Sequence, residues 1–437
     1  MNMKKHLLLG SAFLAAALFP SCGRQEGNAP VSPARDSGFV TEYLTPTRVV
    51  LAKGPVADAE LFMRPYVGQV STDEPLVVSF APGGSVLLDF GKEIQGGIQI
   101  VRSMSGGKAP ARFRLCLGES VSEALSDVRK EGSTATNDHS VRDLEISVPW
   151  LGAAEYGNSG FRFARLDYLG DDERIGIVAV RAISKYRDIP YLGSFRCSDP
   201  RLDQIWQTGA YTVHLNMQEY LWDGIKRDRL VWIGDMHPEV MTVGTVFGDQ
   251  PVVRRSLDYV RDRTDPTSWM NGICSYSLWW IIIQHHLYQW YGNMDYLKEQ
   301  KVYLANLLDY VLLNVRGSRE VYQSGRFIDW PSNDQPDVIH AGLQALTVRA
   351  LEAGSEMSRL LGDVFMAQRC AETAKAMREY VPGHAGNSQA AALLAIEDMM
   401  DAEEASKIIL ANGPGKFTSF MGYYLLEALA KGGRYAE

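Results

Sequence analysis

The sequence predicts a mixed fold, in which an N-terminal β-sandwich is followed by an antiparallel α/α toroid. From about Thr41 to Tyr191, short apolar runs alternate with glycine turns, which is typical of β-strands. After Ser198 the apolar residues recur with a helical period, and helical segments continue along the rest of the chain. A length of 437 residues also fits two or three domains.

The β region shows five segments that are apolar runs between glycines or that alternate apolar and polar residues: Ser85–Gly91, Gly97–Val101, Ala111–Leu117, Gly160–Tyr168 and Gly176–Ile183. Repeated short strands with turn signals between them favour a β-sandwich. The polar stretch from Gly118 to Asn137 is predicted to be a long loop. We expect this domain to span residues 41–195.

The helical region begins at Ser198-Asp199-Pro200, a helix-start signal with proline at the first helical position. Ten amphipathic or apolar helical segments are predicted near residues 199–218, 236–247, 250–263, 277–291, 294–315, 337–361, 363–380, 387–396, 401–411 and 417–431. Short connections alternate with long polar ones, which favours an α/α toroid over a four-helix bundle. We expect the toroid to span residues 196–437.

The N-terminus has the pattern of an export signal. Lys4 and Lys5 precede an apolar stretch, Leu7–Phe19, that is too short to span a bilayer as a mature helix. Cys22 follows in a lipobox-like position. We therefore expect a lipoprotein signal peptide at residues 1–22, a lipid on Cys22, a flexible tether at 23–40, and a periplasmic or cell-surface location on a membrane.

Composition and spacing argue against several other classes of protein. A net charge of −8 disfavours a nucleic-acid partner, since binding phosphates needs a basic surface. The cysteines after Cys22 form no C-x-x-C pair, and His285 and His286 are adjacent instead of one helical turn apart. No metal and no cofactor is expected.

The segment from Trp222 to Asp235 holds the densest set of chemical groups, with three aspartates, three cations and two tryptophans. The aspartates are spaced five and then seven apart, so they do not share one helix face. We predict a loop whose carboxylates are held by Lys226, Arg227 and Arg229. Carboxylates beside aromatic rings suit the binding and cleavage of a sugar. A buried structural salt-bridge network remains the alternative.

A second pair of an acid and an aromatic ring, Asp329 and Trp330, lies in another predicted interhelical loop. Trp330 could stack on a sugar face, and the alternative is a buried turn capped by Ser332 or Asn333. Trp269 and the Trp279-Trp280 pair lie near a helix start, where tryptophans are more often core residues than ligand contacts. His237 could line the same pocket as Asp235.

The Trp222–Asp235 segment resembles the acidic motif of bacterial α-L-rhamnosidases, which are inverting glycoside hydrolases of family 78 in the six-hairpin glycosidase superfamily. Leu88-Asp89-Phe90-Gly91 and Gly160-Phe161-Arg162-Phe163 resemble strand motifs of the same family, and Phe327-Ile328-Asp329-Trp330 resembles its G-D-W loop. The resemblance covers roughly residues 80 to 437. It implies β-sandwich domains followed by an (α/α)₆ barrel.

The resemblance also implies roles for single residues. Asp223 and Asp235 match acids that hold rhamnose hydroxyls, and Trp330 matches a sugar-stacking aromatic. Asp228 falls at the position of the family's general acid. We add Arg227, Trp232 and Asp329 as candidate substrate-binding residues because they flank these positions.

Two departures from the family pattern bear on catalysis. Asp228 replaces a glutamate, so its carboxyl is retracted by roughly 1.5 Å, and Glu239 is a possible substitute proton donor. No segment resembles the T-T-x-W-E-like stretch that carries the family's catalytic base, and about ten helices are counted instead of twelve. We therefore expect an (α/α)₆ toroid lacking its last helices, the product of an incomplete gene.

These features predict hydrolysis of terminal α-L-rhamnosides with inversion in the full-length form, with a rhamnose-containing glycan or glycoside as partner. Three alternatives stay open. The protein could be a glycan-binding lipoprotein without turnover, a related toroid glycosidase that acts on another sugar, or a structural lipoprotein with no ligand.

Overall fold

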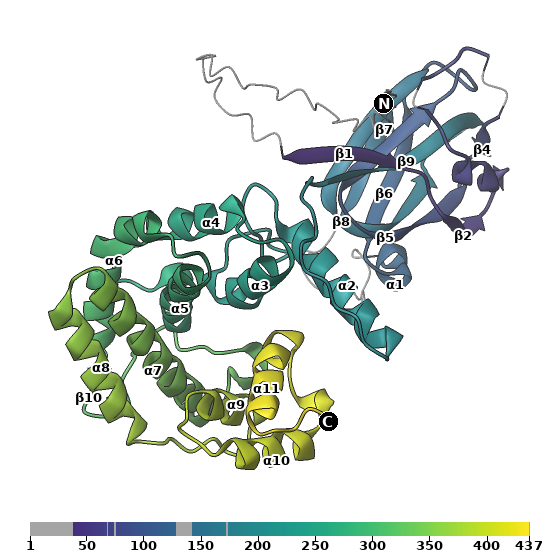
Figure 1. Cartoon of the computed structure of the whole chain (residues 1–437). Coiled ribbons are helices and arrows are strands. Elements are labelled where there is room, and N and C mark those ends of the chain that lie inside the picture. The colour runs from purple at the N-terminus through teal and green to yellow at the C-terminus, as the bar shows by residue number, and fades with distance from the viewer. Residues whose placement is uncertain (1–37, 68, 74–75, 128–141, 172–173, 437) are drawn as a thin grey trace, which may run out of the picture. The chain divides into compact units, whose positions relative to one another are not determined.

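The computed structural model describes residues 38–67, 69–73, 76–127, 142–171 and 174–436. It confirms the mixed fold class, since most strands lie between Phe39 and Arg187 and most helices between Pro200 and Lys431 (Figure 1). By their contacts, residues 38–437 form one unit, so the predicted domain boundary between residues 195 and 196 stays a prediction.

The β region is one antiparallel sheet of nine strands. Its strands are β1 (Phe39–Leu44), β2 (Arg48–Lys53), β3 (Val56–Ala57), β4 (Val78–Phe80), β5 (Ser85–Arg102), β6 (Ala111–Gly118), β7 (Asp143–Val148), β8 (Gly152–Tyr168) and β9 (Ile175–Arg187), with a 3-10 turn, η1, at Ala59–Met63. The sequence predicts two short segments here, but β5 is one strand of 18 residues.

Strand β5 changes neighbours along its length, which explains how one sheet encloses a core. It pairs with β2 over Ser85–Asp89 and with β9 over Gly96–Arg102, while β8 stays on its other side. Gly96 lies in this second part with φ 150°, and a Cβ there would lie 1.9 Å from the Ile183 carbonyl oxygen. Only glycine permits this close approach of β9.

The stretch from Gly118 to Asn137 is not wholly a loop, which corrects the prediction. Helix α1 spans Val121–Leu125, and residues 128–141 lie outside the described part of the chain. The side chain of Ser120 accepts a hydrogen bond from the Glu123 backbone N–H at 3.2 Å, which caps the helix start.

All ten predicted helical segments after Ser198 are present as α-helices. They are α2 (Pro200–Asn216), α3 (Ile233–Val246), α4 (Pro251–Arg261), α5 (Cys274–Tyr291), α6 (Met294–Leu313), α7 (Pro336–Leu360), α8 (Val364–Arg378), α9 (Ser388–Ile396), α10 (Ala402–Asn412) and α11 (Ser419–Lys431). A two-stranded hairpin of β10 (Val315–Arg316) and β11 (Arg319–Glu320) follows α6. The short 3-10 turns are η2 (Met270–Gly272), η3 (Trp330–Ser332) and η4 (Pro414–Lys416).

The odd-numbered helices from α3 to α11 form the inner layer of the helical region (Figure 1). Each packs against the next one, α3 on α5, α5 on α7, α7 on α9 and α9 on α11, and α11 also contacts α3. Helix α5 is buried along most of its length from Cys274 to Leu287, as an inner helix requires. The N-terminal ends of three of these helices, α3, α5 and α11, carry residues of the pocket described below.

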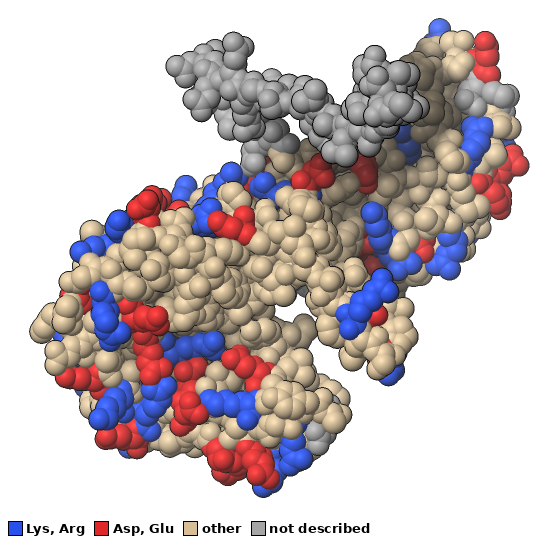
Figure 2. Space-filling view, viewed as in Figure 1, with Lys and Arg blue, Asp and Glu red and all other residues tan. Residues whose placement is uncertain are grey.

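The visible face of the helical region carries charges of both signs, interspersed over helices α8 and α10 (Figure 2). Surface pairs such as Lys407 and Glu403, 3.3 Å apart, contribute to this pattern. Within the described ranges, no helix is both long and apolar enough to cross a bilayer. Cys22, the signal peptide and most of the predicted tether lie outside those ranges.

Candidate active site

The segment between α2 and α3 carries four of the predicted site residues, Asp223, Arg227, Asp228 and Trp232. Backbone hydrogen bonds close it into a loop, because the Asp223 N–H donates to the Leu230 carbonyl at 3.1 Å. The Leu230 N–H in turn donates to Asp223 Oδ1 at 2.9 Å. Asp228 and Arg229 both have positive φ, at 45° and 60°, which is a strained backbone for these residues.

Helix α3 begins at Ile233, three residues earlier than predicted, so Asp235 lies in the first helical turn instead of in the loop. A carboxylate there faces the positive end of the helix dipole. Asp223 and Asp228 thus lie in the loop, whereas Asp235 lies in the first turn of α3.

Only one of the three predicted cation contacts to the aspartates is found. Arg227 lies 3.6 Å from Asp228, and its side chain is largely exposed. Lys226 instead pairs with Glu123 of α1, and Arg229 donates to the Asn158 carbonyl at 2.6 Å and covers the Trp222 ring. The prediction was wrong for Lys226 and Arg229 because residues distant in sequence supply their partners.

A cavity of about 170 Å³ gathers residues from four separate segments. It lies at the N-terminal ends of α3, α5 and α11 and at η3. Its lining comprises two carboxylates, four aromatic side chains, a phenol and smaller groups: Gly234, Asp235, Tyr276, Trp279, Phe327, Ile328, Asp329, Trp330, Thr418, Ser419 and Phe420. The structure therefore brings the predicted residues Asp235, Asp329 and Trp330 together.

Asp235 and Asp223 hold their protons more tightly than an exposed aspartate does, because their pKa values are raised. Burial raises the pKa of Asp235 to about 6, with a further contribution from the charge of Asp329. Burial also raises the pKa of Asp223 to about 7, aided by the charges of Asp235 and Asp228. The Tyr276 hydroxyl donates to Asp235 Oδ2 at 3.4 Å and partly opposes this shift. Near neutral pH these carboxyls can therefore hold protons.

The Asp329 carboxylate is held by hydrogen bonds from residues that could not be identified from the sequence. Its Oδ2 accepts hydrogen bonds from Gln389 Nε2 at 2.9 Å and from Thr418 Oγ1 at 2.5 Å. Its Oδ1 accepts from the Trp330 N–H at 2.8 Å, which starts the η3 turn. Gln389 and Thr418 belong to segments 60 and 89 residues away, and no local motif marks them.

Trp279 and Trp280 have different environments although they are neighbours. Trp279 lines the cavity, whereas Trp280 is fully buried in the core. Trp269 is also a core residue. Trp232 packs edge-on against Tyr276, with ring centroids 6.0 Å apart, and is not among the cavity's lining residues.

Glu239 and His237 lie behind the cavity instead of in its lining. Burial holds the pKa of Glu239 well above its usual range, and its Oε1 accepts a hydrogen bond from Asn216 at 2.8 Å. His237 is completely buried, where it is hydrogen-bonded to Tyr424 at 2.8 Å and stacked on Trp279. His237 thus supports a cavity residue, which differs from the prediction that it lines the pocket.

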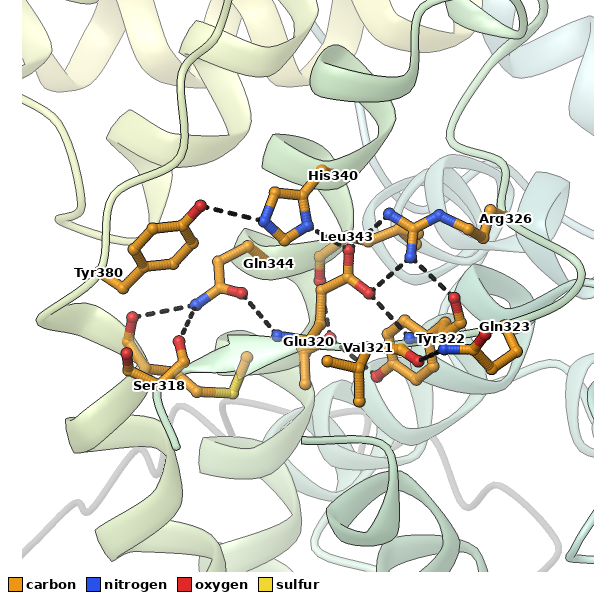
Figure 3. A network of polar contacts seen from close by, with 12 residues as sticks. Ser318, Glu320, Val321, Tyr322, Gln323, Arg326, His340, Leu343, Gln344 and Tyr380 are labelled. Atoms are coloured by element: carbon orange, nitrogen blue, oxygen red, sulfur yellow. Dashed lines mark hydrogen bonds and ion pairs between the residues drawn. The ribbon is translucent and has the colours of Figure 1, made fainter. Parts of the chain in front are cut away.

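The loop that leads to Asp329 and Trp330 is anchored by a buried polar network (Figure 3). Glu320 on β11 is fully buried, and it forms an ion pair with Arg326 and a hydrogen bond with His340 Nδ1 of α7. The Glu320 N–H donates to Gln344 Oε1 at 2.9 Å, and the Arg326 guanidinium also donates to the Tyr322 carbonyl at 2.9 Å. Arg326 directly precedes Phe327, so this network fixes one end of the cavity wall.

Among the residues described, no group of three or more histidine, cysteine, aspartate or glutamate side chains is placed to hold a metal ion. The chemistry that the described site residues can perform is proton transfer by carboxyls and binding of a flat, partly apolar ligand between aromatic rings.

Comparisons with known proteins identify a domain within the chain and a fold. Residues 190–397 match the family model described as a bacterial alpha-L-rhamnosidase six-hairpin glycosidase domain. A comparison with curated proteins gave no match.

Solved structures of rhamnosidases have the same fold. A rhamnosidase from Klebsiella oxytoca with rhamnose bound is 18% identical, with a TM-score of 0.74, over 91% of this chain and 84% of that one. A family 78 rhamnosidase of Bacillus sp. GL1 is 20% identical, with a TM-score of 0.66, over 80% of this chain and 40% of that one. An α-L-rhamnosidase of Streptomyces avermitilis complexed with L-rhamnose is 17% identical, with a TM-score of 0.62, over 80% and 36%.

The family match covers the loop, α3, α5 and the Asp329–Trp330 turn, which carry most of the cavity. Residues 190–397, just under half of the chain, therefore form a six-hairpin glycosidase domain of the bacterial alpha-L-rhamnosidase type, a type of glycoside hydrolase domain.

Proposed function

We propose that this protein hydrolyses terminal α-L-rhamnosides at the cavity lined by Asp235, Asp329 and Trp330. The observation that carries the proposal is the convergence of two carboxyls, of which Asp235 has a raised pKa, with aromatic rings in a cavity of about 170 Å³. That arrangement combines proton transfer with binding of one sugar ring. The rhamnose seen in the Klebsiella and Streptomyces structures supports the choice of sugar.

The aromatic rings and the fixed carboxylate would bind the sugar. Phe327 and Trp330 lie edge to face, with centroids 5.3 Å apart, and present apolar surface to C–H groups. Asp329 is held by Gln389 and Thr418, so its oxygens are oriented before a ligand arrives. A preoriented acceptor loses little freedom when it accepts a hydrogen bond from a sugar hydroxyl.

Two residues are candidates for the proton donor. By the family resemblance Asp228 protonates the leaving oxygen, and its strained backbone beside Arg227 marks it as a specialised position. Asp223, with a pKa of about 7, is a carboxyl of the loop that can hold a proton near neutral pH. Glu239 is buried outside the lining of the cavity, so we assign it a supporting role through its electrostatic interaction with Asp235 and Asp223.

An inverting mechanism follows from the family resemblance. In such a mechanism one carboxyl protonates the leaving oxygen while a second carboxylate activates water on the opposite face of the sugar. We also propose, from the Cys22 pattern, that a lipid anchors the protein at a bacterial membrane surface.

A panel of aryl glycosides tests the proposed activity. The aryl α-L-rhamnoside should be cleaved faster than aryl glycosides of other sugars, and proton NMR should show β-rhamnose as the first product. Cleavage of another sugar in preference would favour a related toroid glycosidase. Binding of rhamnose without any cleavage would favour a glycan-binding protein.

Asn substitutions identify the proton donor. Asp228→Asn and Asp223→Asn each keep the side-chain shape and remove the acid. The true donor should lose at least ~100-fold in turnover, and the other residue should change mainly the KM.

A further inference from the structure

The loop between α2 and α3 contains a sharply turned backbone segment. The Arg229 N–H donates to the Arg227 carbonyl at 2.5 Å, which closes a three-residue turn with Asp228 at its centre. Asp228 and Arg229 have positive φ, at 45° and 60°. A turn of this kind is strained, so it persists only where the surrounding structure holds it. Because both candidate proton donors, Asp223 and Asp228, lie in this loop, the residues that hold the turn bear on catalysis.

The β region holds one side of the turn through Lys226. Lys226 is buried, and its ammonium forms an ion pair with Glu123 of helix α1. The Lys226 carbonyl accepts a hydrogen bond from Arg142 at 3.0 Å. Helix α1 packs on β6 and β8, and Glu123 Oε2 accepts a hydrogen bond from the Glu119 N–H at 2.7 Å. Glu123 is thus a well-anchored partner for a residue two positions before Asp228.

The β region also holds the residue that follows Asp228. The Arg229 guanidinium donates to the Asn158 carbonyl at 2.6 Å and to Asn158 Oδ1 at 3.3 Å. Gly160, two residues further along β8, packs closely on the loop, since a Cβ there would lie 2.6 Å from Ile225 Cγ1. The contacts of β8 and the ion pair with α1 therefore tie the chain to the β region on both sides of the turn.

The strand motifs at Gly160–Phe163 and Leu88–Gly91 meet beside this contact. Gly160 has no side chain, which lets the loop approach β8 closely. Arg162 lies on the same face of β8, because side chains two residues apart in a strand point the same way. It donates to both carboxylate oxygens of Asp89 on β5, at 2.8 and 3.1 Å. This ion pair ties β8 to β5 next to the point where the loop packs.

We propose that Glu123 and Gly160 are positioning residues, which hold the loop so that its proton donor reaches the leaving oxygen of the substrate. The β region is then part of the catalytic unit, although none of its described residues lines the cavity of about 170 Å³. This inference rests on the proposed function, because it takes Asp223 or Asp228 as the proton donor.

Two substrates with different leaving groups test the proposal. Phenyl α-L-rhamnoside has a poor leaving group that needs the proton, whereas dinitrophenyl α-L-rhamnoside releases a stable anion that does not. Glu123→Gln keeps the side-chain shape and removes the charge that pairs with Lys226. It should lower the kcat for the phenyl glycoside about tenfold and the kcat for the dinitrophenyl glycoside less than about twofold. A loss of folded protein alone would lower both rates equally.

Gly160→Ala is the second variant, and it leaves every charge in place. Its Cβ would displace Ile225, so the phenyl glycoside should again lose more activity than the dinitrophenyl glycoside. Gly176→Ala on β9 is the matched control, because a Cβ there would lie 2.7 Å from Ser103 Oγ, outside the loop. This control should leave the ratio of the two kcat values at its wild-type value.

Hydrogen exchange measured by mass spectrometry reports on the loop directly and needs no substrate. Glu123→Gln should speed exchange of the amides of residues 223–230 on the order of tenfold, because the loop loses one charged partner. Asp143→Asn is the control, since it weakens another largely buried ion pair of the β region, with Arg114. It should leave the exchange of the loop and the ratio of the two kcat values unchanged.

An equal fall in both kcat values in Glu123→Gln and Gly160→Ala, or unchanged loop exchange in Glu123→Gln, would overturn the positioning role and leave the proposed function intact. Cleavage of neither glycoside by the wild type would remove the proposed function. Loop exchange would then decide separately whether the β region holds the turn: faster exchange in Glu123→Gln would support that contact, and unchanged exchange would overturn it.

Discussion

Two buried carboxyls of this protein, Glu320 and Asp235, differ in the partners that surround them. Glu320 is fully buried but paired with Arg326 and His340, and these donors lower its pKa despite its burial. Asp235 has one long hydrogen bond from Tyr276, so burial dominates and raises its pKa to about 6. Burial alone therefore does not decide the pKa of a carboxyl. In these two residues, the partners of the carboxyl decide whether its pKa is raised or lowered.

The largest effect on stability is expected from substitution of Glu320, the carboxyl paired with Arg326 and His340. Glu320→Ala removes the acceptor of a network that ties β11 and the loop at Arg326 to α7, so we expect a loss of about 3 kcal/mol in the free energy of unfolding. Denaturant titration measures this loss. Glu352→Ala, which breaks a half-exposed pair with Arg378, is the control and should cost less than about 1 kcal/mol. Equal losses in both variants would remove the structural role of the Glu320 network.

The next largest effect is expected from substitution of Asp235, the carboxyl whose pKa is raised by burial. Asp235→Asn keeps the shape of the protonated side chain and removes the charge that is costly to bury. We expect rhamnoside hydrolysis to fall about 100-fold while the melting temperature at pH 8 stays the same or rises. Activity assays and calorimetry on the same sample check both. A fall in melting temperature would mean that ionised Asp235 stabilises the fold, as ionised Glu320 does.

A smaller effect, on rhamnose binding, is expected from substitution of Trp330, the exposed aromatic residue of the cavity. Trp330→Ala should weaken rhamnose binding about tenfold, because aromatic contacts of this kind contribute on the order of 1 kcal/mol. The free energy of unfolding should change little, since Trp330 is largely exposed. Val302→Ala, at another exposed apolar residue outside the cavity, should change neither quantity.

The smallest effect is on the pH dependence of stability, and its sign differs between the two carboxyls. The pKa of Asp235 is raised, so its contribution is complete below about pH 4 and is lost as the pH rises through 6. The pKa of Glu320 is lowered, so its contribution is present above its usual pKa and is lost as the pH falls below that value.

Melting temperatures across pH 3 to 8 check this difference. Asp235→Asn should reduce the decline of the wild type between about pH 4 and 7, and Glu320→Gln should reduce the decline below about pH 4.5. Parallel pH profiles for both variants would contradict the contrast between paired and unpaired carboxyls.

The helices could be predicted from the sequence because their signal is local. Apolar periodicity and start signals such as Asp199-Pro200 lie within each helix, and all ten predicted helical segments are found. Helix α1 was missed because it has only five residues and no apolar period. A local signal was available, since Ser120 and Glu123 have the spacing of a capping box.

The site could be predicted only in part, because its contacts join distant segments. The motif and the Asp329-Trp330 pair identified three cavity residues, but nothing local marks Thr418 or Gln389 as partners of Asp329. Charge proximity in the sequence was misleading for Lys226, whose partner Glu123 lies 103 residues away. The raised pKa values follow from burial, which depends on packing that the motif does not contain.

The most direct test of the proposed activity compares the rates at which the wild type and Asp235→Asn cleave an aryl α-L-rhamnoside. Cleavage by the wild type, with at least ~100-fold loss in the variant and no loss of stability, would place the reaction at the cavity of Asp235, Asp329 and Trp330. Equal rates for the two proteins, or no cleavage by a wild type that binds rhamnose, would contradict it.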